Sequence, residues 1–371
     1  MLHLMKTPNR VKTPNRVARL LVAAVMAALT LLMVSSQSVF ADGSGHNKGA
    51  TLRSEATELG IHIGSAVGST QLSTDTQYAQ ILGQQFSAIT PENEMKWASV
   101  EAQRGVFTFG PADAEVQFAE QHHQLVRGHN LVWHSQLPTW LTSGTFTNEQ
   151  LADLLKQHIF TEAGHFRGKI WQWDVVNEPF NDDGTLRSTI WEQALGPNYF
   201  ADALRWTHEA DPHAKLFLND YNIEGAGPKS DAMYALVKSL KEQHVPIDGV
   251  GFETHLGLQF GLPSMQPNLQ RFADLGLDVD ITEMDVRMIL PATPALLATQ
   301  ASWYAQVLQA CIAVRRCVDF TVWEYTDKYS WIPGFFTGQG SADIYDENFV
   351  PKPAYAALLD ALKHPVSHQR H

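Results

Sequence analysis

The chain has 371 residues, 44% of them hydrophobic and 18% charged, which is typical of a globular protein and not of a disordered or fibrous one. Its formal net charge of −12 argues against nucleic acid or an anionic membrane surface as a partner. The length allows one large or two medium domains, and a single α/β barrel fits within it.

The first 41 residues differ from the rest of the chain. Five basic residues and no acid precede or enter an apolar run at 18–33, and Val39-Phe40-Ala41 then offers a small-residue cleavage site. This three-part layout predicts a secretory signal. An anchoring helix is the alternative, but a run of about 16 residues is short for a membrane span of about 20. We expect residues 1–41 to be removed and residues 42–371 to be secreted, without a membrane partner.

After Asp42 a polar leader precedes a helical pattern at 52–59, and strand-like apolar runs then alternate with helical patterns. The helical stretches include 197–210, 230–243 and 295–313. The eight candidate strands are 61–67, 86–90, 125–132, 170–176, 216–220, 249–255, 279–283 and 318–323.

This alternation predicts a parallel sheet with right-handed crossovers, and eight such units close naturally into a (β/α)8 TIM barrel. An open doubly wound sheet is the alternative fold, but no glycine-rich phosphate turn follows the first strand. No repeat or linker divides the chain after Asp42. We therefore predict one catalytic barrel domain over 42–371, acting as a monomer.

The fourth candidate strand ends abruptly at Asn177-Glu178-Pro179, because proline cannot donate to a sheet ladder. In the seventh candidate strand, alternation places Val279, Ile281, Glu283 and Asp285 on one face, so we expect Glu283 to follow two apolar core residues into the barrel mouth. Either glutamate alone could form a structural salt bridge at the barrel mouth. Two carboxylates that face each other across one cleft are the arrangement that glycoside cleavage requires.

Polar and aromatic side chains cluster at the other strand ends. Amide, imidazole and amino groups can grip sugar hydroxyls, while flat aromatic faces pack on pyranose rings. The candidate sugar-binding positions are Glu92, Asn93, Lys96, His129, Trp133, Gln136, Tyr221, His255, Trp323 and Trp331.

Several long motifs occur together in order, and with them the chain resembles the family 10 glycoside hydrolases, the endo-1,4-β-xylanases. The motifs are PENEMK at 91–96, GHNLVWHSQ at 128–136, WDVVNEP at 173–179 and TEMD at 282–285. The match runs from about residue 59 to 357. The resemblance implies a TIM barrel and a retaining double displacement on β-1,4-xylan, with Glu178 as the general acid/base and Glu283 as the nucleophile.

The resemblance also implies roles for other residues. Asn177 matches a residue that contacts the sugar 2-hydroxyl, His255 one that is bonded to the nucleophile, and Asp285 the carboxylate that holds this histidine. Tyr221 matches a tyrosine that lines the cleft. The positions that match glycone-side binding residues are Glu92, Asn93, Lys96, His129, Trp133, Gln136, Trp323 and Trp331.

Cys311 and Cys317 are the two cysteines of the chain. Export would place them where disulfides persist, although two buried free thiols are the alternative. The resemblance favours a disulfide before the eighth strand. Neither their spacing nor a neighbouring histidine suggests zinc, and we expect no metal.

Two residues depart from the family pattern. Glu253 stands where glutamine is usual, and alternation places it on the face of His255, so it is either a third carboxylate near the site or part of a structural pair. Glu324 stands where glycine is common, and we expect it to add bulk beside the aglycone route.

Two other functions remain open from the sequence. A β-1,4-glucanase of the same clan would need room for a hydroxymethyl group, which Trp323 and Trp331 are expected to crowd. A barrel that only binds polysaccharide would be expected to lack Glu178 or Glu283, and both are present. No organic cofactor is expected, because acetal cleavage requires only proton transfer and a nucleophile.

Overall fold

The computed structural model describes residues 49–366. The predicted signal segment, residues 1–41, lies outside the described residues. The strands are β1 His62–Val67, β2 Ala88–Pro91, β3 Leu125–Val132, β4 Gln172–Asn177, β5 Lys215–Asp220, β6 Gly249–Phe252, β7 His255–Gly257, β8 Asp278–Ile289, β9 Cys317–Val322 and β10 Gln339–Gly340.

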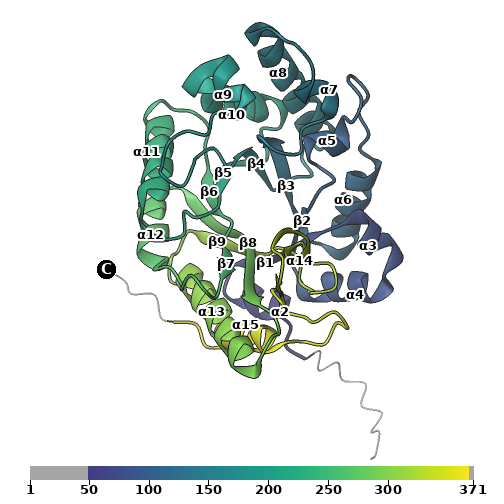
Figure 1. Ribbon diagram of the computed structural model, residues 1–371, viewed down its shortest axis with the longest axis vertical. Helices are drawn as coiled ribbons and strands as arrows, with labels where there is room; N and C mark the ends of the chain where they lie inside the picture. The colour runs from purple at the N-terminus through teal and green to yellow at the C-terminus, as the bar shows by residue number, and fades with distance from the viewer. Residues whose placement is uncertain (1–48, 367–371) are drawn as a thin grey trace, which may run out of the picture. The chain divides into compact units, whose positions relative to one another are not determined.

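Eight of these strands form a closed parallel barrel. Neighbours pair in parallel from β1 through β6, β6 pairs with β8, and β9 pairs with both β8 and β1. The β8–β9 and β9–β1 pairings close the ring, so the open-sheet alternative is wrong and the predicted TIM barrel is confirmed. In Figure 1 the strands form the centre of the molecule and the helices surround them.

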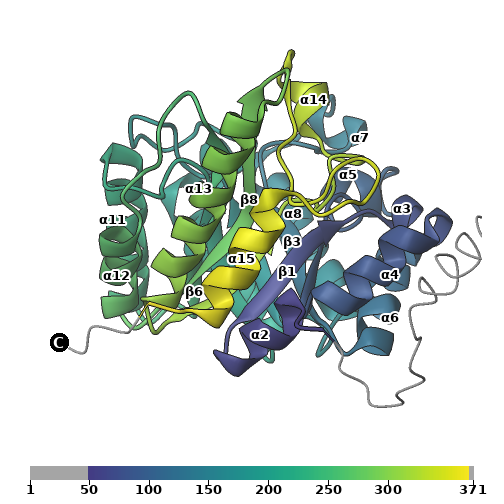
Figure 2. The same ribbon diagram turned by 90° about the horizontal axis from the view of Figure 1, so that it is seen from below.

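The helices pack on the outside of the barrel, as the view in Figure 2 shows for α13 beside β8, with α15 packed against α13. Their bounds are α2 Leu52–Glu58, α3 Ser69–Thr74, α4 Thr76–Gln85, α5 Trp97–Val100, α6 Gly110–His122, α7 Thr139–Thr142, α8 Asn148–His165, α9 Ile190–Leu195, α10 Tyr199–Ala210, α11 Pro228–Glu242, α12 Gln266–Asp274, α13 Pro294–Ile312, α14 Ile332–Phe335 and α15 Pro353–Lys363, with a 3-10 turn at Gly196–Asn198. Within the described residues 49–366, no helix is both long and apolar enough to cross a bilayer.

The residues at the helix starts are those that favour helix capping. The Thr293 side chain accepts a hydrogen bond from the Leu296 N–H, and Pro294 occupies the first position of α13, where its missing N–H is not needed. Thr147 and Gln150 form a reciprocal capping box at the start of α8. The helix predicted at 197–210 begins only at Tyr199, because Pro197 lies in the 3-10 turn before it.

The sixth predicted strand, 249–255, is interrupted in the structure. β6 ends at Phe252, and a separate short strand, β7, begins at His255 and pairs with the far end of β8. Thr254 between them has a φ of 65°, a left-handed conformation that no strand continues through. β8 runs on to Ile289 and pairs there with the antiparallel β10, well beyond the predicted end at 283.

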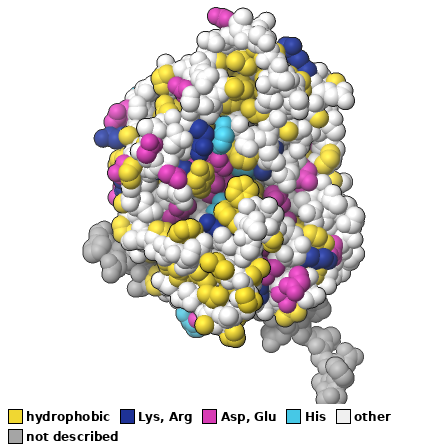
Figure 3. All heavy atoms as spheres, in the orientation of Figure 1, with side chains coloured by type: hydrophobic (Ala, Val, Ile, Leu, Met, Phe, Trp, Pro, Cys, Tyr) yellow, Lys and Arg dark blue, Asp and Glu magenta, His cyan; other side chains and the backbone are white. Residues whose placement is uncertain are grey.

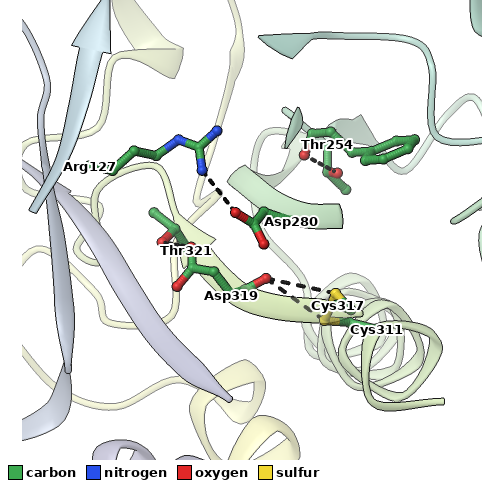
Figure 4. Close-up of a disulfide and its surroundings, with 8 residues drawn as sticks. Arg127, Thr254, Asp280, Cys311, Cys317, Asp319 and Thr321 are labelled. Carbon is green, nitrogen blue, oxygen red and sulfur yellow. Dashed lines mark hydrogen bonds and ion pairs between the residues drawn. A yellow bond between two sulfur atoms is a disulfide. The ribbon is translucent and has the colours of Figure 1, made fainter. Parts of the chain in front are cut away.

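Cys311 at the end of α13 and Cys317 at the start of β9 form the expected disulfide, with Cα atoms 5.3 Å apart. Figure 4 shows the two sulfur atoms next to the backbone of β9 at Asp319. The bridge therefore lies at the amino-terminal end of a barrel strand, the end opposite to the one where TIM barrels carry their chemistry.

This position predicts that the disulfide contributes to stability and not to activity. Replacing both cysteines by alanine is expected to lower the free energy of unfolding by about 2 kcal/mol, the loop-entropy value for so short a loop. Urea unfolding of both proteins measures this loss, and kcat/KM should be unchanged. A variant of full stability and reduced activity would contradict the assignment.

Candidate active site

A cleft of about 690 Å³ opens at the carboxyl ends of the barrel strands. Figure 3 shows a hollow on this face in which acidic, basic, histidine and apolar side chains gather. The predicted residues that line the cleft are Glu92, Asn93, Lys96, His129, Trp133, Gln136, Asn177, Glu178, Tyr221, His255, Glu283, Trp323 and Trp331. The structure thus brings both glutamates and all the candidate sugar-binding positions to one place.

A β-bulge turns Glu283 into the cleft. β8 and β9 pair Ile281 with Phe320 and Met284 with Val322, so β8 contains one extra residue over this step. As a result, the consecutive Thr282 and Glu283 both bond Asn219 inside the barrel, at 2.7 and 2.9 Å. The predicted alternation along β8 is therefore wrong at this point, because Val279 and Ile281 belong to the apolar core and the extra residue brings Glu283 to the opposite face of the strand.

Glu178 also follows a bulge. β4 pairs Asp174 with Phe217 and Val176 with Leu218, two residues against one. Glu178 itself has a φ of 50°, which is sparsely populated for a residue with a side chain. Its backbone is held on both sides, since its N–H donates to Asn219 O at 2.8 Å and its carbonyl accepts from Arg187 Nε at 3.0 Å.

The amide of Asn219 joins the two halves of the site. Its Nδ2 donates to Asn177 Oδ1 at 2.8 Å and to Glu283 Oε1 at 2.9 Å. Gly251 on β6 leaves the space that this amide needs, because a Cβ there would lie 2.1 Å from Asn219 Oδ1. The Asn219 amide thus fixes the side chain of Glu283, the predicted nucleophile, and that of Asn177, the predicted contact to the sugar 2-hydroxyl.

A hydrogen-bonded chain runs from Asp285 through His255 to Glu283. His255 Nδ1 lies 2.7 Å from Asp285 Oδ2, and its Nε2 lies 3.1 Å from Glu283 Oε2. Trp331 Nε1 donates to the same Asp285 oxygen at 2.9 Å, and its ring packs edge-on against His255. Burial works against a charged imidazole, but the two carboxylates outweigh it and raise the pKa of His255 to about 10.

The two glutamates have opposite pKa shifts. Burial alone would raise the pKa of Glu283, but the hydrogen bond from His255 and the nearby His129 bring it below its ordinary value. Burial and the negative charge of Glu283 raise the pKa of Glu178. The site therefore holds one ionised carboxylate and one carboxyl group that keeps its proton longer than usual, which is how acid and nucleophile roles are separated.

Beneath the cleft, Arg127 anchors the floor of the site. Its guanidinium bonds both oxygens of Asp174 and reaches Asp280 at 3.0 Å, and all three residues are buried. Asp174 in turn lies 3.0 Å from His129 Nδ1. The paired Arg127 and Asp174 thus fix the orientation of His129, whose Nδ1 lies 3.9 Å from Glu283 Oε1.

On the β2–β3 side, Lys96 lies over two aromatic rings, with Nζ 5.0 Å from the centre of Trp133 and 5.8 Å from that of Trp323. Asn93 accepts hydrogen bonds from Lys96 Nζ at 3.4 Å and from Gln136 Nε2 at 3.1 Å. These contacts preorganise a polar and aromatic wall of the kind that binds sugar rings.

On the opposite wall, Tyr221 is held by two cations. Arg187 Nη2 donates to its hydroxyl at 2.8 Å, and Lys229 Nζ lies 3.3 Å from its ring centre. Lys229 also pairs with Asp220 at 2.9 Å. The sequence does not indicate that Arg187 and Lys229 contact the cleft, because Arg187 lies in a loop after β4 and Lys229 in the first turn of α11.

The structure resolves the two departures from the family pattern. Glu253 is a third carboxyl group of the cleft, bonded by Asn219 Nδ2 at 3.2 Å and only 2% exposed. The expectation for Glu324 is wrong, because its side chain is fully buried and accepts hydrogen bonds from Tyr78 OH at 3.0 Å, away from the cleft. Its φ of 63° is the left-handed geometry that glycine adopts without strain.

Six further cleft residues were not assigned a role from the sequence: His134, Ser135, Asn222, Arg287, Phe335 and Phe336. His134 Nε2 lies 3.7 Å from Glu178 Oε2, and burial lowers the pKa of this histidine to about 4, so it is neutral. Arg287, Phe335 and Phe336 line the far end of the cleft, where the guanidinium lies 4.0 Å from the Phe336 ring centre. Arg287 lies on the part of β8 beyond the predicted strand end at 283, and α14 is too short to leave a helical pattern in the sequence.

Within the described part of the chain, Glu253, His255 and Glu283 form the one group whose ligand atoms are close enough to hold a metal, all within 4.8 Å of one another. The imidazole is a poor ligand here, because both of its nitrogens face carboxylates and its raised pKa keeps both protonated. We interpret the group as a hydrogen-bonded network.

Two glutamates with opposite pKa shifts, one directly after β4 and one on β8, lie together in a cleft suited to sugars and define the class of the glycoside hydrolases. The model of glycosyl hydrolase family 10 matches residues 51–361, and the chain belongs to this family.

The proteins that are similar to this chain are named as xylanases. The chain is 48% identical over 301 residues to endo-1,4-beta-xylanase C of Phanerodontia chrysosporium, covering 80% of this chain and 75% of that protein. It is also 48% identical to an endo-1,4-beta-xylanase of Agaricus bisporus, covering 81% of this chain and 90% of the relative. The crystal structure of xylanase 10B from Thermotoga petrophila RKU-1 in complex with xylobiose superposes with a TM-score of 0.84 at 43% identity, covering 86% of this chain and 99% of that one.

Proposed function

We propose that the protein is an endo-1,4-β-xylanase that cleaves internal linkages of xylan with retention of anomeric configuration. The observation that carries the proposal is the arrangement of the two glutamates in one cleft: Asn219 Nδ2 and His255 Nε2 lie 2.9 and 3.1 Å from the carboxylate oxygens of Glu283. Burial and the charge of Glu283 raise the pKa of Glu178, which suits a general acid. The named activity of relatives at 48% identity supports the choice of substrate.

In the first step, Glu178 donates its proton to the oxygen of the departing sugar, and a Glu283 oxygen attacks the anomeric carbon. The glycosidic bond breaks, and a covalent glycosyl-enzyme forms on Glu283. Asn177, whose Oδ1 is fixed by Asn219, contacts the 2-hydroxyl of the reacting sugar. For direct attack we expect the two carboxyl groups to lie about 5–5.5 Å apart.

In the second step, Glu178 has lost its proton and acts as a base. It takes a proton from water, whose oxygen attacks the anomeric carbon and releases Glu283. The second inversion restores the β configuration. The same residue serves as acid and then as base because the negative charge on Glu283 is neutralised in the intermediate, which lowers the pKa of Glu178 at that stage.

The substrate assignment is tested against the β-1,4-glucanase alternative. Trp323 is 5% exposed and packs edge-on against His129, and Trp331 is tied to Asp285, so neither ring is free to move aside for a hydroxymethyl group. We expect faster hydrolysis of xylan than of carboxymethylcellulose in parallel assays. Faster cleavage of the cellulose derivative would overturn the substrate assignment and leave the mechanism in place.

The opposite pKa shifts predict a bell-shaped pH profile. Activity requires ionised Glu283, so it falls as the pH drops through that group's lowered pKa. It also requires protonated Glu178, so it falls as the pH rises through that group's raised pKa. Measuring kcat/KM on xylo-oligosaccharides from acidic to alkaline pH checks both limbs. A flat profile across mildly acidic to neutral pH would contradict these roles.

We further propose that the enzyme is secreted and acts as a monomer. Export is supported by the basic head and apolar run of residues 1–41 and by the disulfide between Cys311 and Cys317, a bond that persists in oxidising compartments. Mass spectrometry of the mature amino terminus from culture medium tests export, and light scattering tests the oligomeric state.

A further inference from the structure

Glu253 is a third carboxyl group in the cleft, and the mechanism above does not use it. It follows β6 directly and is almost completely buried, with 2% of its surface exposed. Its Oε1 lies 3.2 Å from Asn219 Nδ2, and its Oε2 lies 3.9 Å from His255 Nε2, which is too long for a hydrogen bond.

The hydrogen-bond donors around Glu253 are already taken. The Asn219 amide has two hydrogens for three acceptors, and the contact to Glu253 is longer than those to Asn177 and Glu283. His255 directs its two N–H groups to Asp285 and Glu283. A charged Glu253 would therefore be a buried anion with at most one shared donor, and such a group is strongly destabilised.

The charged neighbours of Glu253 also favour its neutral form. Burial raises the pKa of Glu253 well above its ordinary value, and the charges of Glu283, Glu178 and Asp220 raise it further, against a smaller opposing effect of Lys229. The titratable groups that face it are Glu283 and Asp285 on β8, Glu178 after β4, Asp220 at the end of β5, Lys229 on α11, His255 on β7, Lys96 after β2 and Glu224, which bonds the Thr254 N–H. Burial, the scarcity of donors and the neighbouring charges thus all favour the neutral form of Glu253.

The position of His255 links the charge of Glu253 to the nucleophile. Its Nε2 is 3.1 Å from Glu283 and 3.9 Å from Glu253, so a small rotation of the ring would exchange one carboxyl partner for the other. A neutral Glu253 is a weak competitor for this N–H, whereas an ionised one is an equal competitor.

We propose that Glu253 is a positioning residue that works only in its neutral form, leaving the His255 Nε2–H to Glu283, and that its ionisation at alkaline pH draws this N–H away from the nucleophile. The inference rests on the proposed glycoside hydrolysis by Glu178 and Glu283. No bond to substrate is involved, since the proton of Glu253 simply passes to solvent.

An activated aryl β-xylobioside, such as the 2,4-dinitrophenyl compound, separates this effect from that of Glu178. Its leaving group departs without protonation, so kcat/KM does not fall when Glu178 loses its proton. We expect the wild-type kcat/KM still to fall at alkaline pH. Glu253→Gln keeps the shape and the acceptor for Asn219 but cannot ionise. In this variant, the pH at which kcat/KM falls on the alkaline side should be higher by at least one pH unit.

Glu324→Gln is the matched control, because Glu324 is also a buried glutamate with a raised pKa but bonds Tyr78 outside the cleft. Its alkaline limb should coincide with that of the wild type. Coinciding limbs in wild type and Glu253→Gln would overturn the proposal. If the wild type hydrolyses no xylo-oligosaccharide at all, the proposed function fails instead, so the two failures are distinguishable.

A measurement on the wild type covers the case in which Glu253→Gln does not fold. The imidazole ¹⁵N signals of His255, assigned by their loss in His255→Asn, should shift at the pH of the alkaline limb in kcat/KM, before the ring itself deprotonates. If the ¹⁵N signals show one transition only, that of deprotonation of the imidazole itself, the proposal is contradicted.

Discussion

Replacing Glu283 by alanine is expected to lower kcat/KM on xylo-oligosaccharides by about 10⁴-fold or more, because no other group can form the covalent intermediate. Glu253 also lines the cleft, but its Oε1 bonds Asn219 and burial, the largest cause of its raised pKa, still disfavours its charged form in the variant. Activity should be lost on natural and activated aryl substrates alike, since both need the nucleophile. Steady-state kinetics on the two substrate types measures this loss.

Glu120→Gln serves as the control for this experiment, because Glu120 is an exposed residue on α6, outside the cleft. It should behave as the wild type. Thermal unfolding of both variants shows whether the fold is intact. A folded Glu283→Ala protein that retains more than about a hundredth of the wild-type rate would remove Glu283 from the nucleophile role.

Replacing Glu178 by alanine is expected to give a loss that depends on the leaving group. On xylan, kcat/KM should fall by about 10²–10⁴-fold, the usual contribution of a positioned general acid. On a dinitrophenyl β-xylobioside, formation of the glycosyl-enzyme should be nearly unaffected, because the leaving group needs no proton. Its hydrolysis should be slow without a base, so the intermediate accumulates and a burst of dinitrophenol precedes slow turnover.

Azide provides a second readout for this variant. The anion needs no general base and fits the space that the side chain vacates, so it should speed turnover of the activated substrate and yield a β-glycosyl azide. Equal losses on both substrates, with no response to azide, would show that Glu178 supports the fold and does not transfer a proton.

The alternation of strands and helices could be predicted from the sequence, because each barrel strand is a short apolar run, and Pro179 marks where β4 stops. The ends of β6 and β8 could not be predicted, since β6 stops at Phe252 and β8 runs on to Ile289. Since strand ends collect on one face of a parallel barrel, the cleft residues followed from the same reasoning. The disulfide could be expected from the predicted export and from the resemblance to the family, which favours a bridge before the eighth strand.

The orientation of individual side chains could not be predicted in this way. Glu283 reaches the cleft through a bulge in β8, and a bulge depends on pairing with a neighbouring strand that is distant in sequence. Glu324 lies two residues after the end of β9, and its left-handed backbone directs the carboxyl to Tyr78. The Arg127–Asp174 fork under the cleft is a tertiary contact between β3 and β4, with no local signal.

The most direct test of the account is the anomeric configuration of the first product released from a short xylo-oligosaccharide, followed by proton NMR before mutarotation. Direct attack by Glu283, with Glu178 on the other side of the bond, predicts that the new reducing end appears first as the β-anomer. An initial α-anomer would mean that a water molecule reacts between two carboxyl groups about 6.5–9.5 Å apart, and it would contradict the covalent mechanism.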